Sequence, residues 1–215
     1  MKKGIILLLV SLFAVSAVYA DGADVLRRKY SQVSIGRNTI KNDQWGKLKS
    51  NIALNYTNGR TFYLHEEEII DMIRFGIDGT WTDLSYARYT RTLPLDGKFK
   101  EYKFNQFDYA LNVGPSVHIN PIDDVYVHAY FRYAPAYSLL FGDKQVYGNY
   151  ATYFVTGLSV SYNFIALGFE GRFGNCNYNN YISAKRLDKL MPHPSNILTE
   201  RVKHRGWRFY VSFMF

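Results

Sequence analysis

Two histidines and a serine are the residues whose types and spacing could most readily do chemistry. Ser116 and His118 are two positions apart, and His128 follows a turn at 120–124. A histidine beside a serine can activate it as a nucleophile, and two histidines could begin a zinc site. A zinc site needs a third ligand, and none is identifiable. We therefore expect no catalytic residues, no metal and no cofactor, and we expect both histidines to be satisfied by neighbouring groups. The other histidines of the chain are His65, His193 and His204.

A second group with chemical capacity consists of charged residues in segments where polar and apolar residues alternate. Side chains point alternately to the two faces of a strand, so residues an even number of positions apart share a face. In these segments the charged residues occupy the face opposite the apolar one. The set comprises Arg74, Asp78, Asp108, Arg132, Glu170, Arg172 and Arg208.

Charges on an enclosed face must pair or be hydrated, because an isolated buried ion is very costly. Glu170 can pair with Arg208 or with Arg172. The two aspartates of the set can pair with Arg74 or with Arg132. We expect a salt-bridged interior that blocks a pore. The alternative is a narrow gated channel in which the same residues set selectivity.

Eight segments have the alternation that would position these charges. The clearest is 106–119, where seven apolar residues occupy every second position. A first segment, 30–38, has the weakest pattern. We predict strands at 30–38, 52–64, 73–82, 106–119, 125–137, 153–163, 165–173 and 206–215.

The connections between these segments alternate in length. The short ones are 65–71, 120–124 and the turn near 163–164, and the long ones are 39–47, 85–103, 139–149 and 175–203. Short turns at one end and long loops at the other are typical of an up-and-down outer-membrane barrel. An even number of strands places both ends of the chain on the periplasmic side.

Asn58-Gly59 interrupts the second segment. This dipeptide is a strong signal for a two-residue hairpin, but it also fits a bulge that resets the alternation and keeps Arg60 off the lipid face. A hairpin would leave strands too short for the ~9–11 residues of a membrane crossing. We therefore favour the bulge.

The last ten residues, 206–215, have one wholly apolar face and one mixed face, and they end on an aromatic residue. They resemble the closing strand of bacterial outer-membrane β-barrels, which commonly ends in Phe with aromatic or aliphatic residues at alternate positions before it. The resemblance implies that this face is the signal recognised by the barrel-assembly machinery. Its residues are Trp207, Phe209, Val211, Phe213 and Phe215.

The start of the chain has the form of a secretory signal peptide. Lys2 and Lys3 precede an apolar run at 4–14, and small residues lead to Ala20. An uncleaved anchor is the alternative, but the run is shorter than the ~20 residues of a spanning helix. We expect residues 1–20 to be removed by cleavage after Ala20, leaving one domain at 21–215.

The net charge and the cysteine content limit the kinds of partner and anchor that we expect. The net charge of +8 becomes +6 without Lys2 and Lys3. An exported basic protein meets anionic envelope polymers such as lipopolysaccharide before nucleic acid, so we expect no nucleic-acid partner. Cys176 is the only cysteine, so the monomer has no internal disulfide and no lipid-anchored cysteine at the cleavage site.

Taken together, these features predict an all-β fold, an eight-stranded antiparallel up-and-down transmembrane β-barrel. It resembles the small OmpA and OmpX-type barrels of Gram-negative outer membranes, and the resemblance includes an ionic plug. A soluble lipocalin-type barrel also has about eight alternating strands. Its polar face would be rich in Lys and Glu, whereas the polar face here is rich in Gly, Ala, Ser and Tyr.

The expected function is structural or interactive: the barrel anchors outer loops that bind lipopolysaccharide or a surface partner. Sites for lipid phosphates favour Arg and Lys. A lipid-modifying enzyme is a third possibility, since PagP-like and PagL-like barrels use His with Ser on lipid A. Ser116 and His118 are expected at the inner end, away from that substrate. The loop cations are Arg88, Arg91, Lys98, Lys100, Lys103, Lys185, Arg186, Lys189, Arg201, Lys203 and Arg205.

Aromatic residues near the strand ends fit an interfacial girdle of the kind that membrane barrels carry. The expected members are Tyr86, Tyr89, Tyr133, Tyr137, Tyr150 and Trp207.

Overall fold

The computed structural model describes most of the chain as strands. It describes residues 27–42, 46–95, 98–122, 124–142, 145–180 and 201–215. The signal peptide expected at 1–20 lies outside these residues. The strands are β1 (Arg27–Asn42), β2 (Gly46–Tyr63), β3 (Ile73–Leu95), β4 (Lys98–Ile122), β5 (Val125–Gly142), β6 (Gln145–Tyr162), β7 (Ile165–Asn177), β8 (Asn179–Asn180) and β9 (Arg201–Met214).

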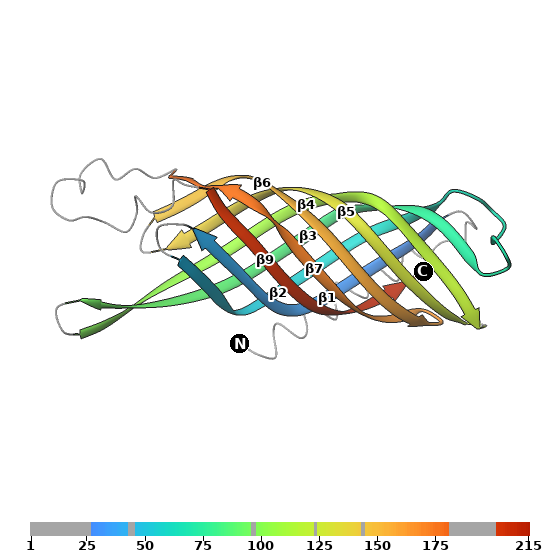
Figure 1. Ribbon diagram of the computed structural model, residues 1–215, viewed down its shortest axis with the longest axis horizontal. Coiled ribbons are helices and arrows are strands. Elements are labelled where there is room, and N and C mark those ends of the chain that lie inside the picture. The colour runs from blue at the N-terminus through green and yellow to red at the C-terminus, as the bar shows by residue number, and fades with distance from the viewer. Residues whose placement is uncertain (1–26, 43–45, 96–97, 123, 143–144, 181–200) are drawn as a thin grey trace.

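The strands form one closed antiparallel barrel (Figure 1). Each long strand pairs with the next along the chain, and the ring is closed by β9, which pairs with both β7 and β1. The two-residue β8 pairs with β6 at Tyr147 and Gly148, in line with the β7 residues that pair with β6 from Ala151 onward. β7 and β8 therefore occupy one place in the ring, and the predicted eight-stranded barrel is confirmed.

The wall of the barrel is apolar outside and polar inside. Ile35 and Leu167 on the outer face have exposed fractions of 55% and 63%, whereas Gln32 and Glu170 on the inner face are buried. A lipocalin-type barrel would have the opposite arrangement. An exposed apolar band around a closed barrel is the surface that lipid covers.

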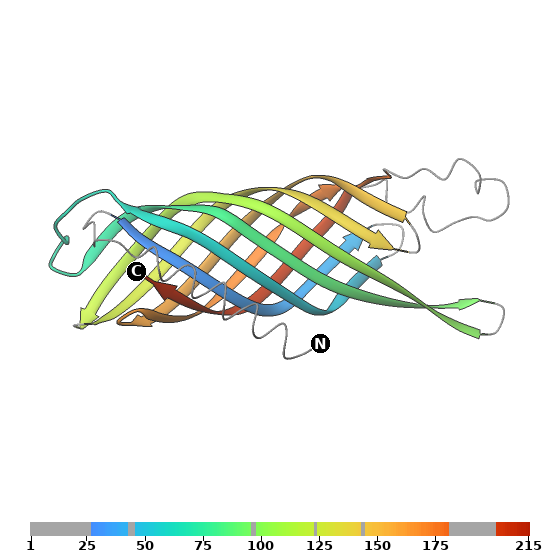
Figure 2. The same cartoon turned by 180° about the vertical axis from the view of Figure 1, so that it is seen from behind.

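Three segments expected as long connections, 39–47, 85–103 and 139–149, are instead largely strand. β3 and β4 pair with each other from Leu95 and Lys98 inward, and they project beyond the rest of the barrel (Figure 2). At 88–92 of β3 and 101–105 of β4 the outward side chains are polar, so the hydrophobic alternation disappears while the backbone ladder continues. Of the expected loop 175–203, residues 181–200 lie outside the described part.

The strand β2 runs through Asn58-Gly59 without a hairpin, as expected. The extra residue of the bulge, however, is in the neighbouring strand. Asn58 pairs with Thr82 and Gly59 pairs with Thr80, which leaves Trp81 of β3 without an opposite residue. The register between β3 and β4 also shifts by one residue at this place, between Thr80 and Asp83. The bulge therefore changes the alternation of β3 and not that of β2.

Two consequences follow for the residues around the bulge. Because β2 keeps its alternation, Arg60 lies on the outward face, contrary to the expectation that a bulge would remove it. A side chain at Gly59 would overlap the ring of Tyr30 inside the barrel, at 2.5 Å from its hydroxyl oxygen. The glycine that suggested a turn is therefore required by a close approach in the lumen.

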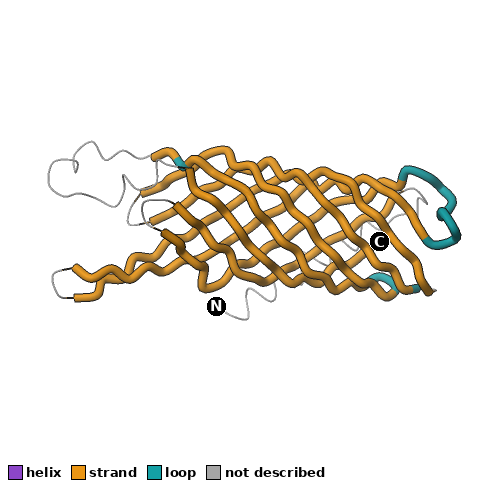
Figure 3. Tube along the Cα trace, in the orientation of Figure 1, coloured by secondary structure: helices purple, strands orange, loops and turns teal. Residues whose placement is uncertain are grey.

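Both ends of the described chain lie at one end of the barrel, which we call the terminal end. The backbone of Lys29 exchanges two hydrogen bonds with that of Phe215, at 2.8 and 2.9 Å. Tight turns with positive φ at Asp124 and Asn163 lie at this same end. We call the opposite end, where β3 and β4 extend furthest, the projecting end (Figure 3). Within the described ranges no helix is long and apolar enough to cross a membrane.

Candidate functional site

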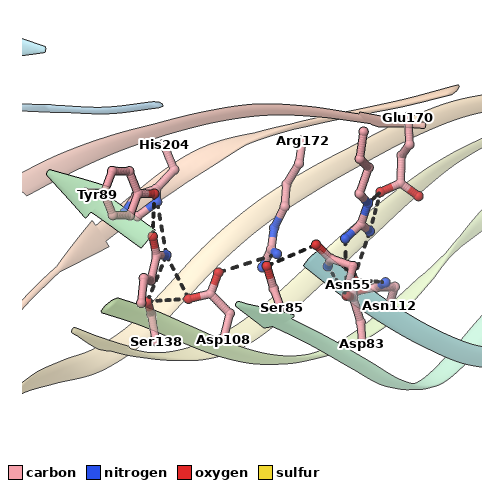
Figure 4. Close-up of polar contacts among 12 residues, drawn as sticks. Asn55, Asp83, Ser85, Tyr89, Asp108, Asn112, Ser138, Glu170, Arg172 and His204 are labelled. Carbon is pink, nitrogen blue, oxygen red and sulfur yellow. Dashed lines mark hydrogen bonds and ion pairs between the residues drawn. The ribbon is translucent and has the colours of Figure 1, made fainter. Parts of the chain in front are cut away.

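The centre of the lumen holds an arginine between two carboxylates. Arg208 of β9 donates hydrogen bonds to Glu170 on the adjacent β7, a pair that sequence spacing allowed. Its Nη2 also lies 3.3 Å from Oδ2 of Asp83 on β3. Asn55 and Asn112 donate to the two oxygens of Asp83 at 3.0 and 2.9 Å. Figure 4 shows this cluster bridging strands on different sides of the barrel.

Asp83 was missed by sequence reasoning because of the bulge at Trp81. Before the bulge the even-numbered residues of β3 point inward, as Asp78 does, and after it the odd-numbered ones do, as Asp83 does. A signal was present in the sequence. Trp81 and Leu84, both apolar and exposed, are three positions apart and cannot share a face without an inserted residue.

A second ion pair lies nearer the terminal end. Arg132 Nε lies 3.0 Å from Oδ2 of Asp78, and Thr61 donates to Oδ1 of the same carboxylate at 2.6 Å. The guanidinium of Arg132 stacks on the ring of Tyr130 at 3.6 Å. Tyr130 in turn donates to Glu170 at 2.6 Å, which joins this pair to the central cluster.

The third pair lies toward the projecting end. Arg172 is 3.5 Å from Asp108, whereas its expected partner was Glu170 and those of Asp108 were Arg74 and Arg132. Ser138 donates to Asp108 at 2.5 Å and Gln106 donates to it at 2.8 Å. Figure 4 shows Asp108 next to Arg172 along the lumen. Because Glu170 already pairs with Arg208, Arg172 pairs with Asp108 instead.

The seventh charged residue of the expected set lies apart from the others. Arg74 is partly exposed at the terminal end and pairs at 3.3 Å with Glu68 of the turn before β3, not with an aspartate of the lumen. The remaining six join Asp83 in the interior. Within the described residues the buried lumen carboxylates number four, against three guanidiniums: Asp78, Asp83, Asp108 and Glu170 against Arg132, Arg172 and Arg208.

Aromatic and apolar side chains fill the lumen toward the projecting end. Tyr89, Tyr153 and Tyr178 are almost completely buried there. Tyr89 was expected in the interfacial girdle, and this prediction was wrong: the shifted alternation of β3 turns it inward, where it donates to Gln106 at 2.7 Å. We call these three tyrosines the tyrosine seal.

The histidines lie in two places in the lumen. His118 and His128 stack with ring centroids 3.9 Å apart, and His128 Nε2 is 3.3 Å from Asp78. His204 lies at the tyrosine seal, 3.4 Å from the hydroxyl of Tyr178. The described residues contain no group of three or more metal-binding side chains. The hydroxyl of Ser116 is buried and has no hydrogen-bond partner among them.

Two histidines fall elsewhere. His65 is in the turn before β3, where its Nε2 accepts a hydrogen bond from the backbone N–H of Phe75 at 3.0 Å. His193 lies outside the described residues.

Cations gather on the outer wall at the projecting end of three neighbouring strands. Lys41 of β1 is directly opposite Lys47 of β2 and Lys203 of β9. One step nearer the centre of the barrel, Thr39 is opposite Lys49 and Arg205. All these lysines and the arginine are exposed and point outward, as Arg37 does. We call this set the basic wall: Arg37, Lys41, Lys47, Lys49, Lys203 and Arg205.

The other cations expected in loops are spread more widely. Arg88 and Lys103 are exposed on β3 and β4, Arg91 is partly exposed on β3, and Arg201 is exposed at the start of β9. The backbones of Lys98 and Lys100 belong to β4. Three residues, Lys185, Arg186 and Lys189, lie outside the described part.

The proposed assembly signal lies along the outward face of β9. Trp207, Phe209 and Val211 have exposed fractions of 45%, 57% and 38%. Phe213 and Phe215 continue the same face to the terminal end, where the ring of Phe213 stacks on that of Phe164 at 6.5 Å. This face therefore belongs to the apolar band that closes the barrel.

Comparison with known proteins identifies the fold. No family model and no curated protein matches the chain. The outer membrane protease OmpT from Escherichia coli matches 88% of this chain and 95% of its own, with 8% identity and a TM-score of 0.50. Ail, the attachment invasion locus protein of Yersinia pestis, was solved with the heparin analogue sucrose octasulfate. It matches 88% of this chain and 99% of its own at 11% identity and a TM-score of 0.46.

A third similar structure is Neisserial surface protein A, which matches 86% of this chain and 96% of its own at 11% identity and a TM-score of 0.46. The closed ring, the apolar outer wall and the similarity to OmpT define the class. The chain has the fold of the small bacterial outer-membrane β-barrels.

Proposed function

We propose that this protein resides in the outer membrane, exported by a signal peptide cleaved after Ala20, and that its basic wall binds the phosphate groups of lipopolysaccharide. The observation that carries the proposal is the direct opposition of Lys41 to both Lys47 and Lys203. Neighbouring strands are about 4.8 Å apart, and like charges directly opposite one another destabilise a sheet. An anion between these lysines would relieve the repulsion.

The height of the basic wall supports a lipid partner. Arg205 is two residues from Trp207 on β9, a rise of about 6.6 Å along the strand. Trp207 is exposed and begins the apolar band. Aromatic residues mark the membrane interface, so Arg37, opposite Trp207, lies at the interface, and Arg205 and Lys203 lie just above it, at the level of lipid headgroups.

The sign of the charge is uniform in this region. The described ends of the three strands, at 37–42, 46–52 and 201–207, contain no aspartate or glutamate. Nearby, Arg88 on β3 is opposite Ile52 of β2 and is also exposed. Lipid phosphates suit such a site, because Arg and Lys both form charge-assisted hydrogen bonds with them.

The proposal is of a binding role and not of catalysis. Ser116 and His118 are buried inside the barrel toward the terminal end, away from the basic wall, and their positions offer no contact with outer-leaflet lipid. The tyrosine seal and the central ion pairs argue against a narrow channel. A surface protein that binds the projecting end of β3 and β4 is compatible with the same anchoring role.

The proposal is tested by lipopolysaccharide binding to the folded barrel in detergent. Each basic side chain near an anionic lipid surface contributes about 1 kcal/mol, so the double variant Lys41→Gln/Lys203→Gln should bind about 30-fold more weakly. Arg60→Gln is the matched control, since Arg60 is also on the outward face but near the terminal end. Equal affinity of the double variant and the control would refute the proposal, as would equal binding of dephosphorylated lipopolysaccharide.

A further inference from the structure

The terminal end of the barrel contains a cavity unconnected with the basic wall. It has a volume of about 230 Å³, far above the ~10–15 Å³ that one water molecule requires. Its lining includes Arg28, Glu68, Arg74, His118 and Tyr126. We call it the terminal basin.

The charges that line the terminal basin are mostly positive. Arg27, Arg28 and Arg74 face it, against the single carboxylate of Glu68. Phe215 also lines it, and a chain-terminal carboxylate at that residue would still leave cations in excess. A concave surface with an excess of guanidinium groups attracts anions, and it does so more strongly where low-dielectric walls focus the field.

Two of these arginines are held in position by the barrel. Arg28 stacks over the ring of Tyr126 at 4.9 Å and donates to the backbone oxygen of Asn163 at 3.0 Å. Arg74 stacks over the ring of Tyr63 at 5.4 Å. Fixed guanidinium groups lose little conformational entropy on binding an anion, and their planar forks match two oxygens at once.

A buried histidine at the inner side of the basin lacks a partner. His118 is only 3% exposed, and its Nδ1 has no hydrogen-bond partner among the described residues. One face of its ring is taken by His128. A buried polar nitrogen normally has a partner, so its location beside the basin indicates a ligand or ordered water there.

We propose that the terminal basin binds a small oxyanion of the phosphate or carboxylate class from the periplasmic side. Arg28 and Arg74 provide the charge, and the Nδ1–H of His118 donates to the anion. Glu68 pairs with Arg74 at 3.3 Å, so it competes with the anion for that guanidinium and limits the affinity.

The basin is a binding site and not the mouth of a pathway. Deeper in the lumen, between His118 and Tyr210, a second cavity among the described residues has a volume of about 10 Å³, which is room for one water molecule at most. An anion would therefore stop beside His118. Anion binding here is independent of the lipopolysaccharide proposal, because it involves the opposite end of the barrel.

The test is a calorimetric titration of the full-length folded barrel, in a neutral detergent at low salt, with inorganic phosphate and separately with acetate. We expect one saturable site for at least one of the two anions, and the stronger of them identifies the class. Hydrogen bonds to charged groups are stronger than those between neutral groups, so Arg28→Gln/Arg74→Gln should weaken binding by at least about tenfold.

Two further variants sharpen the result. Glu68→Gln changes a residue of the turn before β3. It removes the ion pair with Arg74, frees that guanidinium for the anion and should bind the anion several-fold more tightly. Arg88→Gln, an exposed cation at the projecting end, should bind as the unaltered protein does. The inference is overturned by no saturable binding of either anion, by equal binding in the double variant, or by no gain in Glu68→Gln. A mobility shift between boiled and unboiled samples shows that each variant is folded.

Discussion

Asp83 and Arg208, 125 residues apart in the chain, meet across the lumen with two nitrogen–oxygen distances of 3.4 and 3.3 Å. Arg208 also contacts Glu170 beside it, so a single guanidinium joins β3, β7 and β9. Both carboxylates are fully buried. The contact crosses the barrel and forms only when the ring is closed.

The first prediction concerns this cross-lumen pair. Asp83→Asn removes one charge of a buried pair and leaves part of the charge on Arg208 uncompensated, which costs about 3 kcal/mol. We expect that loss in the free energy of unfolding, measured by urea titration in lipid vesicles. Asp124→Asn, the same change in an exposed turn, should alter it by less than about 0.5 kcal/mol. Equal values for the two variants would show that the pair does not hold the strands together.

The second prediction tests the tyrosine seal. The unaltered barrel should show no discrete conductance in planar bilayers, because side chains fill an eight-stranded interior. Replacing Tyr89, Tyr153 and Tyr178 together by alanine should open the projecting end and produce small conductance steps.

A control separates the seal from general damage to the barrel. Tyr133 and Tyr150 point outward, with their hydroxyls 3.3 Å apart. Replacing both by alanine should produce no conductance steps in the bilayer. Conductance steps in the unaltered protein would instead support the channel alternative.

The third prediction concerns the bulge. Deleting Trp81 removes the residue that has no opposite partner, so β3 becomes a regular strand in which Asp78 and Asp83, then four positions apart, still share the inward face. We expect the deletion variant to form a heat-modifiable barrel. Trp81→Ala keeps the extra residue and should assemble as well. Failure of the deletion variant alone would show that the bulge is required, and failure of both variants would mean that the indole is required.

The fourth prediction compares two glycines of β7. A Cβ atom at Gly168 would lie 2.3 Å from the ring of Tyr210, whereas at Gly171 the nearest atom is 3.8 Å away. Gly168→Ala forces Tyr210 to move and should destabilise the barrel by about 1–3 kcal/mol. Gly171→Ala should be within about 0.5 kcal/mol of the unaltered protein. The unfolding free energies of the two variants, compared directly, decide whether the lumen is packed as described.

The pattern of the chain was sufficient for the class of fold. In 106–119 the period of two is uninterrupted, and the structure has the expected outward and inward faces throughout that range. The apolar face of β9 was equally clear. These features are local, because one face of each strand contacts lipid and the other faces the polar interior. Every strand must therefore have both an apolar and a polar face.

Other features depended on tertiary structure. The continuation of β3 and β4 at the projecting end could not be predicted, because the outward side chains at 88–92 and 101–105 are polar and leave no hydrophobic period. That Arg172 pairs with Asp108 and not with Glu170 also has no local signal, because both carboxylates lie on the inward face. The partner depends on which strands face one another across the closed ring and on the pairing of Arg208 with Glu170.

The sequence by itself therefore determined that the chain forms a membrane barrel, which residues of the uninterrupted strands face lipid, and that charges line the interior. Only the tertiary structure decided that Asp83 belongs to that interior, that Lys41 lies between two other lysines, and that Arg28 and Arg74 share one basin. The physical reason is that alternation specifies a face of one strand, whereas contacts between strands depend on register, bulges and closure of the ring.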